Sequence, residues 1–105
     1  MIIVTSNDVP DARITQTIGE CFGLTVRSRN IGSNIGAGLK SLAGGELKGI
    51  TQLLRDARRE ALARLAEEAE ARGANAVVAF RFETTDYGGT GIEVCAYGTA
   101  VVIES

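Results

Sequence analysis

Residues 46 to 72 constrain the fold of this chain most, because their apolar side chains recur at the spacing of one long α-helix. The predicted apolar stripe is rich in alanine and has charged residues opposite it; it consists of Leu47, Ile50, Leu54, Ala57, Ala61, Leu65 and Ala69. At ~1.5 Å per residue this helix would be about 40 Å long, whereas a compact domain of this size has a radius of gyration of about 13 Å. We therefore expect the helix either to break near Gly49 or to reach a neighbouring molecule.

The boundaries of this helix carry further signals. Apolar residues at helical spacing predict a short helix before the long one; they are Ile35, Leu39 and Leu42. Gly44-Gly45 is expected to end the short helix and Gly73 to end the long one. Acidic and basic residues four positions apart are expected to form ion pairs along the long helix, Glu60 with Arg64 and Glu68 with Arg72.

Strands are predicted on both sides of the helix. Residues 2–5 form a short run of β-branched residues, and apolar and polar residues alternate in 13–28, 76–85 and 92–103. The last two are joined by a glycine-containing turn, which predicts a hairpin. The element order is therefore β-β-α-β-β, and we predict an α+β fold in which the long helix and the short preceding helix pack on one face of an antiparallel sheet.

Small residues within the predicted strands indicate where the helix can come close to the sheet. Gly19 and Gly23 interrupt the first long strand, where glycine marks a bulge, a bend or a close backbone approach. Ala96, Gly98 and Ala100 share one face of the last strand and would admit the alanine-rich helix. The other face of the sheet is half apolar, and the chain has no second layer to cover it. We therefore predict a homo-oligomer.

The composition limits the classes of protein to which this chain can belong. The chain has 105 residues, which predicts a single domain over residues 1–105. Its 11 basic and 13 acidic residues lack the basic excess that nucleic-acid binding requires, so we expect no nucleic-acid partner. No apolar run is long enough to span a membrane, and the first residues lack the pattern of a signal peptide. We expect a cytoplasmic protein with reduced cysteines.

Several short motifs, specific when taken together, resemble those of a known family across nearly the whole chain. They are Asn30-Ile31-Gly32, Ala37-Gly38-Leu39, Gly44-Gly45-Glu46, Ala57-Arg58, residues 73–78 and residues 96–101. In these motifs the chain resembles the YbjQ-like family, small bacterial and archaeal proteins labelled "putative heavy-metal-binding" whose function is largely uncharacterised. The resemblance implies a dodecin-like α+β subunit assembled into a ring, a pentamer. It carries over no catalytic residues, and the metal label brings no ligand motif that can be placed on this sequence.

Cys21 and Cys95 are the only soft metal ligands in the sequence, which has no histidine and no C-x-x-C pair. A closed tetrahedral site within one chain is therefore not expected. If both cysteines lie on the face away from the helix, pairing of their strands would bring the thiols together, and a ring would bring further copies to a subunit interface. A soft divalent metal would suit such a site. The alternative is that both cysteines only pack as small apolar side chains.

The glycine-rich segment 27–41 suggests phosphate chemistry, but its spacing excludes both nucleotide motifs. A leucine stands between its last glycine and Lys40, so the segment is not a P-loop, and it lacks the βαβ context of a dinucleotide-binding loop. A generic anion or metabolite site remains, formed by Arg27, Arg29, Gly32 and Lys40 near a helix start. The alternative is that the glycines only permit tight turns and close packing.

No catalytic constellation is present, because no histidine can act as a base and the acidic candidates Glu83, Asp86 and Glu93 flank an ordinary glycine-rich turn. We therefore predict a protein that is not an enzyme. The favoured hypothesis is a non-catalytic, ring-forming homo-oligomer with a structural or ligand-binding role. The two alternatives are a heavy-metal-binding protein that uses Cys21 and Cys95 at a subunit interface, and a small-anion or metabolite binder at residues 27–41. The small-molecule ligand itself cannot be read from the sequence.

Overall fold

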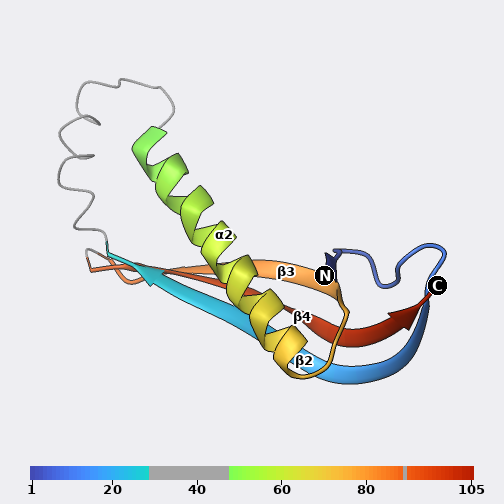
Figure 1. Ribbon diagram of the computed structural model, residues 1–105. Helices are drawn as coiled ribbons and strands as arrows, with labels where there is room; N and C mark the ends of the chain where they lie inside the picture. The colour runs from blue at the N-terminus through green and yellow to red at the C-terminus, as the bar shows by residue number, and fades with distance from the viewer. Residues whose placement is uncertain (29–47, 89) are drawn as a thin grey trace.

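The computed structural model describes residues 1–28, 48–88 and 90–105, which form a four-stranded sheet with one long helix on one face (Figure 1). Along the chain the elements are β1 (Ile2–Ile3), β2 (Arg13–Arg27), α2 (Lys48–Ala71), β3 (Ala76–Asp86) and β4 (Ile92–Glu104). Across the sheet the strands lie in the order β1-β3-β4-β2. The predicted α+β class and long helix are confirmed, and the predicted short helix lies outside the described residues.

The sheet is mixed, so the prediction of a purely antiparallel sheet was wrong. β4 pairs antiparallel with both β2 and β3. β1 instead pairs in parallel with β3, Ile2 with Ala76 and Ile3 with Val77. The connection through β2 and α2 is long enough for a parallel pair, which a tight hairpin turn is not. A run of β-branched residues indicates a strand but not its direction, so the sequence pattern contains no signal for this pairing.

α2 is continuous from Lys48 through Gly49 to Ala71, and its N-terminal end rises away from the sheet (Figure 1). Gly73, with a φ of 90°, follows its last turn, and the N–H of Ala74 donates to the carbonyl oxygen of Ala69 at 3.0 Å. The molecule is elongated, with a radius of gyration of 17.0 Å. The break predicted near Gly49 does not occur, whereas contact of the helix with a neighbour stays a prediction. Within the described ranges no helix combines the length and apolarity needed to cross a membrane.

Alanines allow α2 to pack closely on β2 and β4. The buried residues of the helix are Leu53, Ala57, Ala61, Leu65 and Ala69. The predicted stripe is confirmed at Ala57, Ala61, Leu65 and Ala69. Leu53 is buried in place of Leu54, Ile50 is only partly buried, and Leu47 lies outside the described residues. The closest approach is at Gly23, where a Cβ atom would lie 2.2 Å from the carbonyl oxygen of Ala61 and 2.2 Å from the backbone nitrogen of Leu65. The close backbone approach predicted at Gly23 is therefore confirmed.

A β-bulge in β3 divides the apolar residues of this strand between two faces of the sheet. Ala79 has a φ of 53°, and the register with β4 shifts between Val78 and Arg81. Strict alternation would put Val78 and Phe82 on one face. Instead Phe82 packs on the core under α2, while Val78 belongs to a smaller cluster on the opposite face. Val4 and Val9 of the N-terminal segment cover that smaller cluster.

β2 is an edge strand, and side chains of α2 and of Arg72, which directly follows the helix, bind its free backbone groups. The bonds join Arg72 to the carbonyl oxygens of Ile18 and Glu20, Glu68 to the N–H of Phe22, and Arg64 to the carbonyl oxygen of Leu24. The predicted ion pair of Glu68 with Arg72 is present, with an N–O distance of 3.9 Å. A strand added at this edge would need the same backbone groups. The C-terminal half of α2 therefore closes the β2 edge over residues 18–24.

Candidate functional site

The two cysteines lie on opposite faces of the sheet. Cys21 is fully buried in the core under α2, and its Sγ lies 3.7 Å from the carbonyl oxygen of Gly98. Cys95 is half-buried on the other face, where it stands between Leu24 of β2 and Glu83 of β3. Directly paired residues share a face, so the pairing of Cys21 with Gly98 and of Cys95 with Leu24 separates the thiols. Within one chain they do not converge, although their strands pair.

Both thiols are held in the protonated form. Burial raises the pKa of Cys21, and the carboxylate of Glu68 adds to this effect. Burial also raises the pKa of Cys95, followed by the charges of Glu93, Glu83 and Glu20. Because the thiolate is the metal ligand, a metal ion would have to displace a proton at either position. Within the part of the chain that the structure describes, no three His, Cys, Asp or Glu side chains are grouped so that they could hold a metal.

Arg27, the described member of the predicted anion site, is paired with an acid. Its Nη2 lies 2.8 Å from Oε2 of Glu60, while Arg29, Gly32 and Lys40 lie outside the described residues. Glu60 also accepts a 2.7 Å hydrogen bond from the hydroxyl of the buried Thr25. The predicted Glu60–Arg64 pair completes this network at 2.8 Å. The network ties the end of β2 to α2 through residues that are far apart in sequence, so no local pattern could reveal it.

Replacing Glu60 with glutamine is expected to flatten the acid side of the stability curve. The hydroxyl of Thr25 and then the charges of Arg64 and Arg27 hold the pKa of Glu60 below its ordinary value of 4.5. A lowered folded-state pKa gives stability that is present above the ordinary value and is lost as the pH falls through the folded-state value. Thermal melts followed by circular dichroism should therefore show a lower Tm for Glu60→Gln at neutral pH and a shallower loss of Tm below about pH 4.5.

The matched control for this variant is Glu67→Gln, which changes an exposed glutamate of the same helix. It should follow the wild-type curve. Equal acid slopes for wild type and Glu60→Gln would contradict the role assigned to this network.

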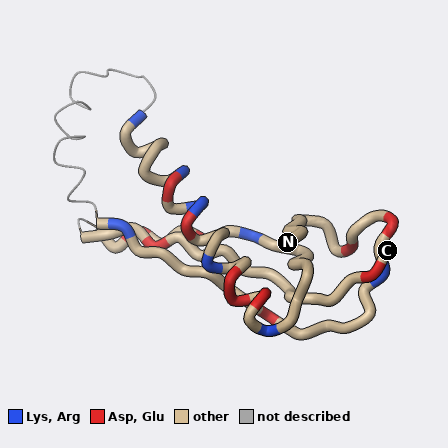
Figure 2. Tube along the Cα trace, viewed as in Figure 1, with Lys and Arg blue, Asp and Glu red and all other residues tan. Residues whose placement is uncertain are grey.

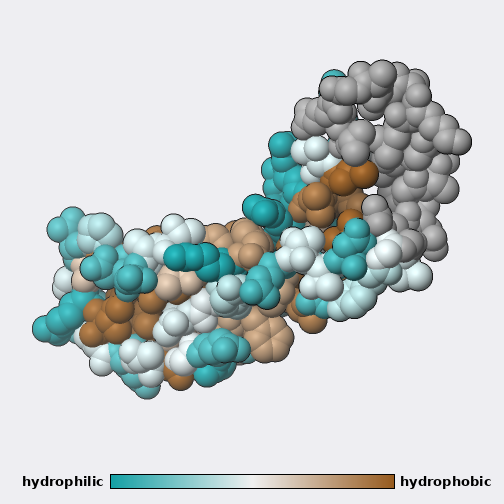
Figure 3. Space-filling model, turned by 180° about the vertical axis from the view of Figure 1, so that it is seen from behind, coloured by the Kyte–Doolittle hydropathy of each residue, from teal (hydrophilic) through white to brown (hydrophobic). Residues whose placement is uncertain are grey.

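The face of the sheet away from α2 carries exposed apolar side chains. We call it the outer face; it consists of Glu20, Phe22, Leu24 and Val26 of β2, Arg81, Glu83 and Thr85 of β3, and Glu93, Cys95, Tyr97 and Thr99 of β4. Phe22, Leu24 and Val26 are 48%, 37% and 60% exposed. Seen from behind, hydrophobic patches lie between hydrophilic residues (Figure 3). This surface is unusual for an isolated subunit and is the candidate functional site.

Two tyrosine hydroxyls donate hydrogen bonds to glutamates of the outer face. The hydroxyl of Tyr97 donates to Oε1 of Glu83 at 3.4 Å. The hydroxyl of Tyr87 donates to Oε2 of Glu93 at 2.7 Å. The carboxylates are thus fixed beside the apolar residues. The outer face therefore combines apolar groups with three glutamates and one cation, Arg81, whose guanidinium donates to the carbonyl oxygen of Thr5.

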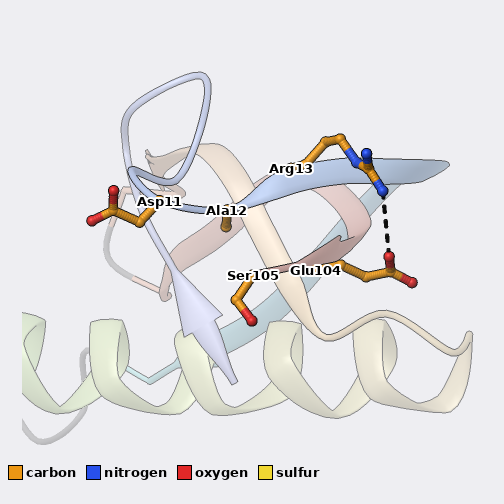
Figure 4. Close-up of a pocket in the computed structure, with 5 residues that line it drawn as sticks. All are labelled: Asp11, Ala12, Arg13, Glu104 and Ser105. Carbon is orange, nitrogen blue, oxygen red and sulfur yellow. Dashed lines mark ion pairs between the residues drawn. The ribbon is translucent and has the colours of Figure 1, made fainter.

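A shallow pocket of about 340 Å³ lies at the C-terminus, beside the start of β2, and is lined by Asp11, Ala12, Arg13, Glu104 and Ser105 (Figure 4). Arg13 and Glu104 form an ion pair at 3.6 Å, with side chains 79% and 64% exposed. Such an exposed pair contributes only about 0–1 kcal/mol. Asp11 points away from this pair in Figure 4, so the charged groups do not converge on one point. We assign no function to the pocket.

Comparison with known proteins identifies the family of this chain. Residues 1–104 match the YbjQ family model, whose description is "Putative heavy-metal-binding". The chain belongs to the YbjQ-like family. It is 76% identical over 104 residues to a UPF0145 protein of Mycobacteroides abscessus, with 99% of this chain and 97% of that one covered. It is 60% identical over 103 residues to a UPF0145 protein of Streptomyces coelicolor, with 98% and 97% covered.

An archaeal relative and a solved structure extend the comparison. A UPF0145 protein of Thermoplasma volcanium is 52% identical over 104 residues, covering 99% of this chain and 85% of that one. A crystal structure of a protein of unknown function from Pediococcus pentosaceus, assigned to the DUF74 family, aligns with a TM-score of 0.53 at 17% identity. That alignment covers 99% of this chain and 98% of the other, and it shows a shared fold. The YbjQ-like resemblance found in the sequence motifs is confirmed.

Proposed function

We propose that this YbjQ-like protein acts as a non-catalytic subunit of a homo-oligomer, a ring of five copies in which each outer face is covered by a neighbour, and that the ring has a structural or ligand-binding role. The observation that carries the proposal is the exposed apolar set on the outer face, Phe22, Leu24 and Val26. Full burial of a side chain of this kind is worth ~1.5–3 kcal/mol, so covering three of them is a substantial driving force. The number of five copies rests on the family resemblance alone.

Native mass spectrometry combined with light scattering at micromolar concentration tests this function. We expect an oligomer for the wild type and a shift to smaller species for Leu24→Ser. Ile14→Ser is the matched control, because Ile14 has the same exposure of 37% on the same strand but lies ten residues before Leu24, opposite Ile103, and so apart from the residues that define the outer face. A wild-type protein that stays monomeric, or a Leu24→Ser variant that assembles as well as wild type, would refute the proposal.

We propose as a second function that the assembled ring binds a soft divalent metal through Cys95. Glu83 stands directly opposite Cys95 on β3, and Glu93 lies two residues before it on the same face. Neighbouring copies would add the remaining ligands at the interface. The description of the family as "Putative heavy-metal-binding" supports this reading. Cys21, buried under the helix, is not expected to take part unless the helix moves.

Cadmium titration of the assembled protein by calorimetry separates the roles of the two thiols. Cys95→Ser should abolish binding, whereas Cys21→Ala should leave it unchanged. Because binding displaces a proton from a thiol of raised pKa, the wild-type affinity should rise between about pH 6 and about pH 8. Unchanged affinity in Cys95→Ser would exclude this function.

A further inference from the structure

The charges of α2 are segregated along its length (Figure 2). The N-terminal half, residues 48–59, carries Lys48, Arg55, Arg58 and Arg59 against Asp56, and the C-terminal half carries Glu60, Glu67, Glu68 and Glu70 against Arg64. No acidic residue lies in the first turn and no basic residue in the last. The helix dipole favours the opposite arrangement, by typically ~0.3–1 kcal/mol per charge. The segregation therefore does not stabilise the helix itself, and it points to a partner for the basic half.

Two arginines of the basic half are available to such a partner. Arg55 and Arg59 are exposed, lie one turn apart on the same side of α2, and form no ion pair with any residue in the described ranges. Arg58 differs, because its guanidinium lies 4.8 Å from the ring centre of Phe82. The end of α2 that precedes Arg55 and Arg59 rises away from the sheet (Figure 1), and both side chains are exposed among the described residues.

The outer face carries the complementary charges. Glu20, Glu83 and Glu93 form no ion pair with a cation in the described part of the chain, and the side chains of two of them accept hydrogen bonds from tyrosine. Because Glu83 pairs with Cys95, Glu83 and Glu93 are diagonal neighbours on adjacent strands. α2 packs on the opposite face of the same sheet, so the arginines of one chain cannot reach these acids.

We infer that the basic half of α2 in one copy docks on the outer face of the next copy, with Arg55 and Arg59 against Glu83 and Glu93. The inference rests on the proposed homo-oligomer and specifies its contact. Because the contact engages both carboxylates beside Cys95, it is an alternative to the metal site and not an addition to it. Side chains one helical turn apart have Cβ atoms ~5–6 Å apart, and diagonal neighbours on a sheet are separated by roughly 7 Å, so two arginine–carboxylate pairs can form together. The arginine stems and guanidinium planes also suit the exposed ring of Phe22 and the partly buried ring of Tyr97, in the way that Arg58 already covers Phe82.

This contact joins two different surfaces of the subunit, so it is heterologous. Repeated head to tail, such a contact closes into a ring when the rotation per copy divides a full turn. It also gives the basic half of the helix a function, because that half would lie on the neighbouring sheet.

Charge reversal tests the contact, with assembly measured by native mass spectrometry and sedimentation at micromolar concentration. Glu83→Lys/Glu93→Lys and Arg55→Glu/Arg59→Glu should each raise the dissociation constant about 100-fold or more, because like charges then face each other. A chain with all four substitutions should assemble within roughly tenfold of wild type, because every pair is restored with its signs exchanged. Glu67→Lys/Glu70→Lys is the matched control, since it makes the same charge change on the other half of the same helix, and it should assemble as wild type does.

A mixture of the two reversed chains gives a second readout should the fourfold variant not fold. Each reversed outer face then meets a reversed helix, so the equimolar mixture should assemble while each component alone does not. Circular dichroism confirms folding of every chain. If both reversed chains assemble like wild type, the docking of α2 on the outer face is refuted. The proposed homo-oligomer is then retained, and a different surface must cover the outer face. If wild type itself is monomeric, the proposed function falls together with this contact.

Discussion

Replacing Gly23 with alanine is expected to destabilise the protein by about 3 kcal/mol or more and to lower its Tm by roughly 15 °C. The added Cβ would lie 2.2 Å from the carbonyl oxygen of Ala61 and 2.2 Å from the backbone nitrogen of Leu65. These are backbone atoms of the helix, so no rotamer change can relieve the clash, and α2 must move away from β2. Urea denaturation at fixed protein concentration measures the loss, since the stability of an oligomer depends on concentration.

Gly98→Ala is the matched control for this variant, because it adds the same methyl group to the same face of the sheet. Its closest neighbour would be Cγ1 of Val77 at 2.7 Å, with the carbonyl oxygen of Val78 at 3.0 Å. The third neighbour would be Cα of Phe80 at 3.1 Å. All three distances are longer than the 2.2 Å contacts at Gly23, so the cost should be about 1–2 kcal/mol. An equal cost for the two variants would show that the helix does not rest on Gly23 in the way described.

Replacing Leu65 with alanine should cost about 3 kcal/mol, within the ~2–5 kcal/mol range for buried leucines. Leu65 is the largest of the fully buried side chains in the described residues. Its alanine neighbours and the glycine beneath it are too small to fill the space that it leaves. The fall in urea midpoint at unchanged m-value measures this loss. Leu62→Ala is the control, since that leucine of the same helix is only partly buried; a comparable fall there would contradict the packing.

The long helix and the strands could be predicted from the sequence because each depends on a local pattern. Ala57, Ala61 and Leu65 recur at helical spacing, and the close contact at Gly23 follows from a glycine inside a strand that faces an alanine-rich helix. These features are encoded by neighbours along the chain, so no knowledge of the tertiary structure is needed.

The positions of the cysteines could not be predicted, because alternation divides a strand into two faces without saying which one is covered. The sequence does hold one usable signal. Cys21 shares its face with Gly23 and Thr25, and small residues of this kind suit a helix that approaches closely, whereas Cys95 shares its face with Glu93 and Tyr97. The face that the helix covers could therefore have been predicted from the small side-chain volumes on it.

The long-range contacts of the fold correspond to no local pattern in the sequence. The bulge at Ala79 exchanges the faces of β3, and nothing about an alanine indicates a positive φ. The hydrogen bond between Thr25 and Glu60 joins distant parts of the chain in the same way. Such contacts arise only when the helix is laid on the sheet, so periodicity cannot reveal them.

The closed edge of β2 links the stability of the helix to the solubility of the protein. The groups that close this edge belong to Arg64, Glu68 and Arg72, so the backbone of residues 18–24 is protected only while the C-terminal half of α2 is in place. A partial opening of that half would expose unpaired strand backbone next to Phe22 and Leu24, which is a template for intermolecular pairing. Local opening needs less free energy than global unfolding. Aggregation of this protein should therefore follow the population of the helix-open state, well below the temperature at which the sheet itself melts.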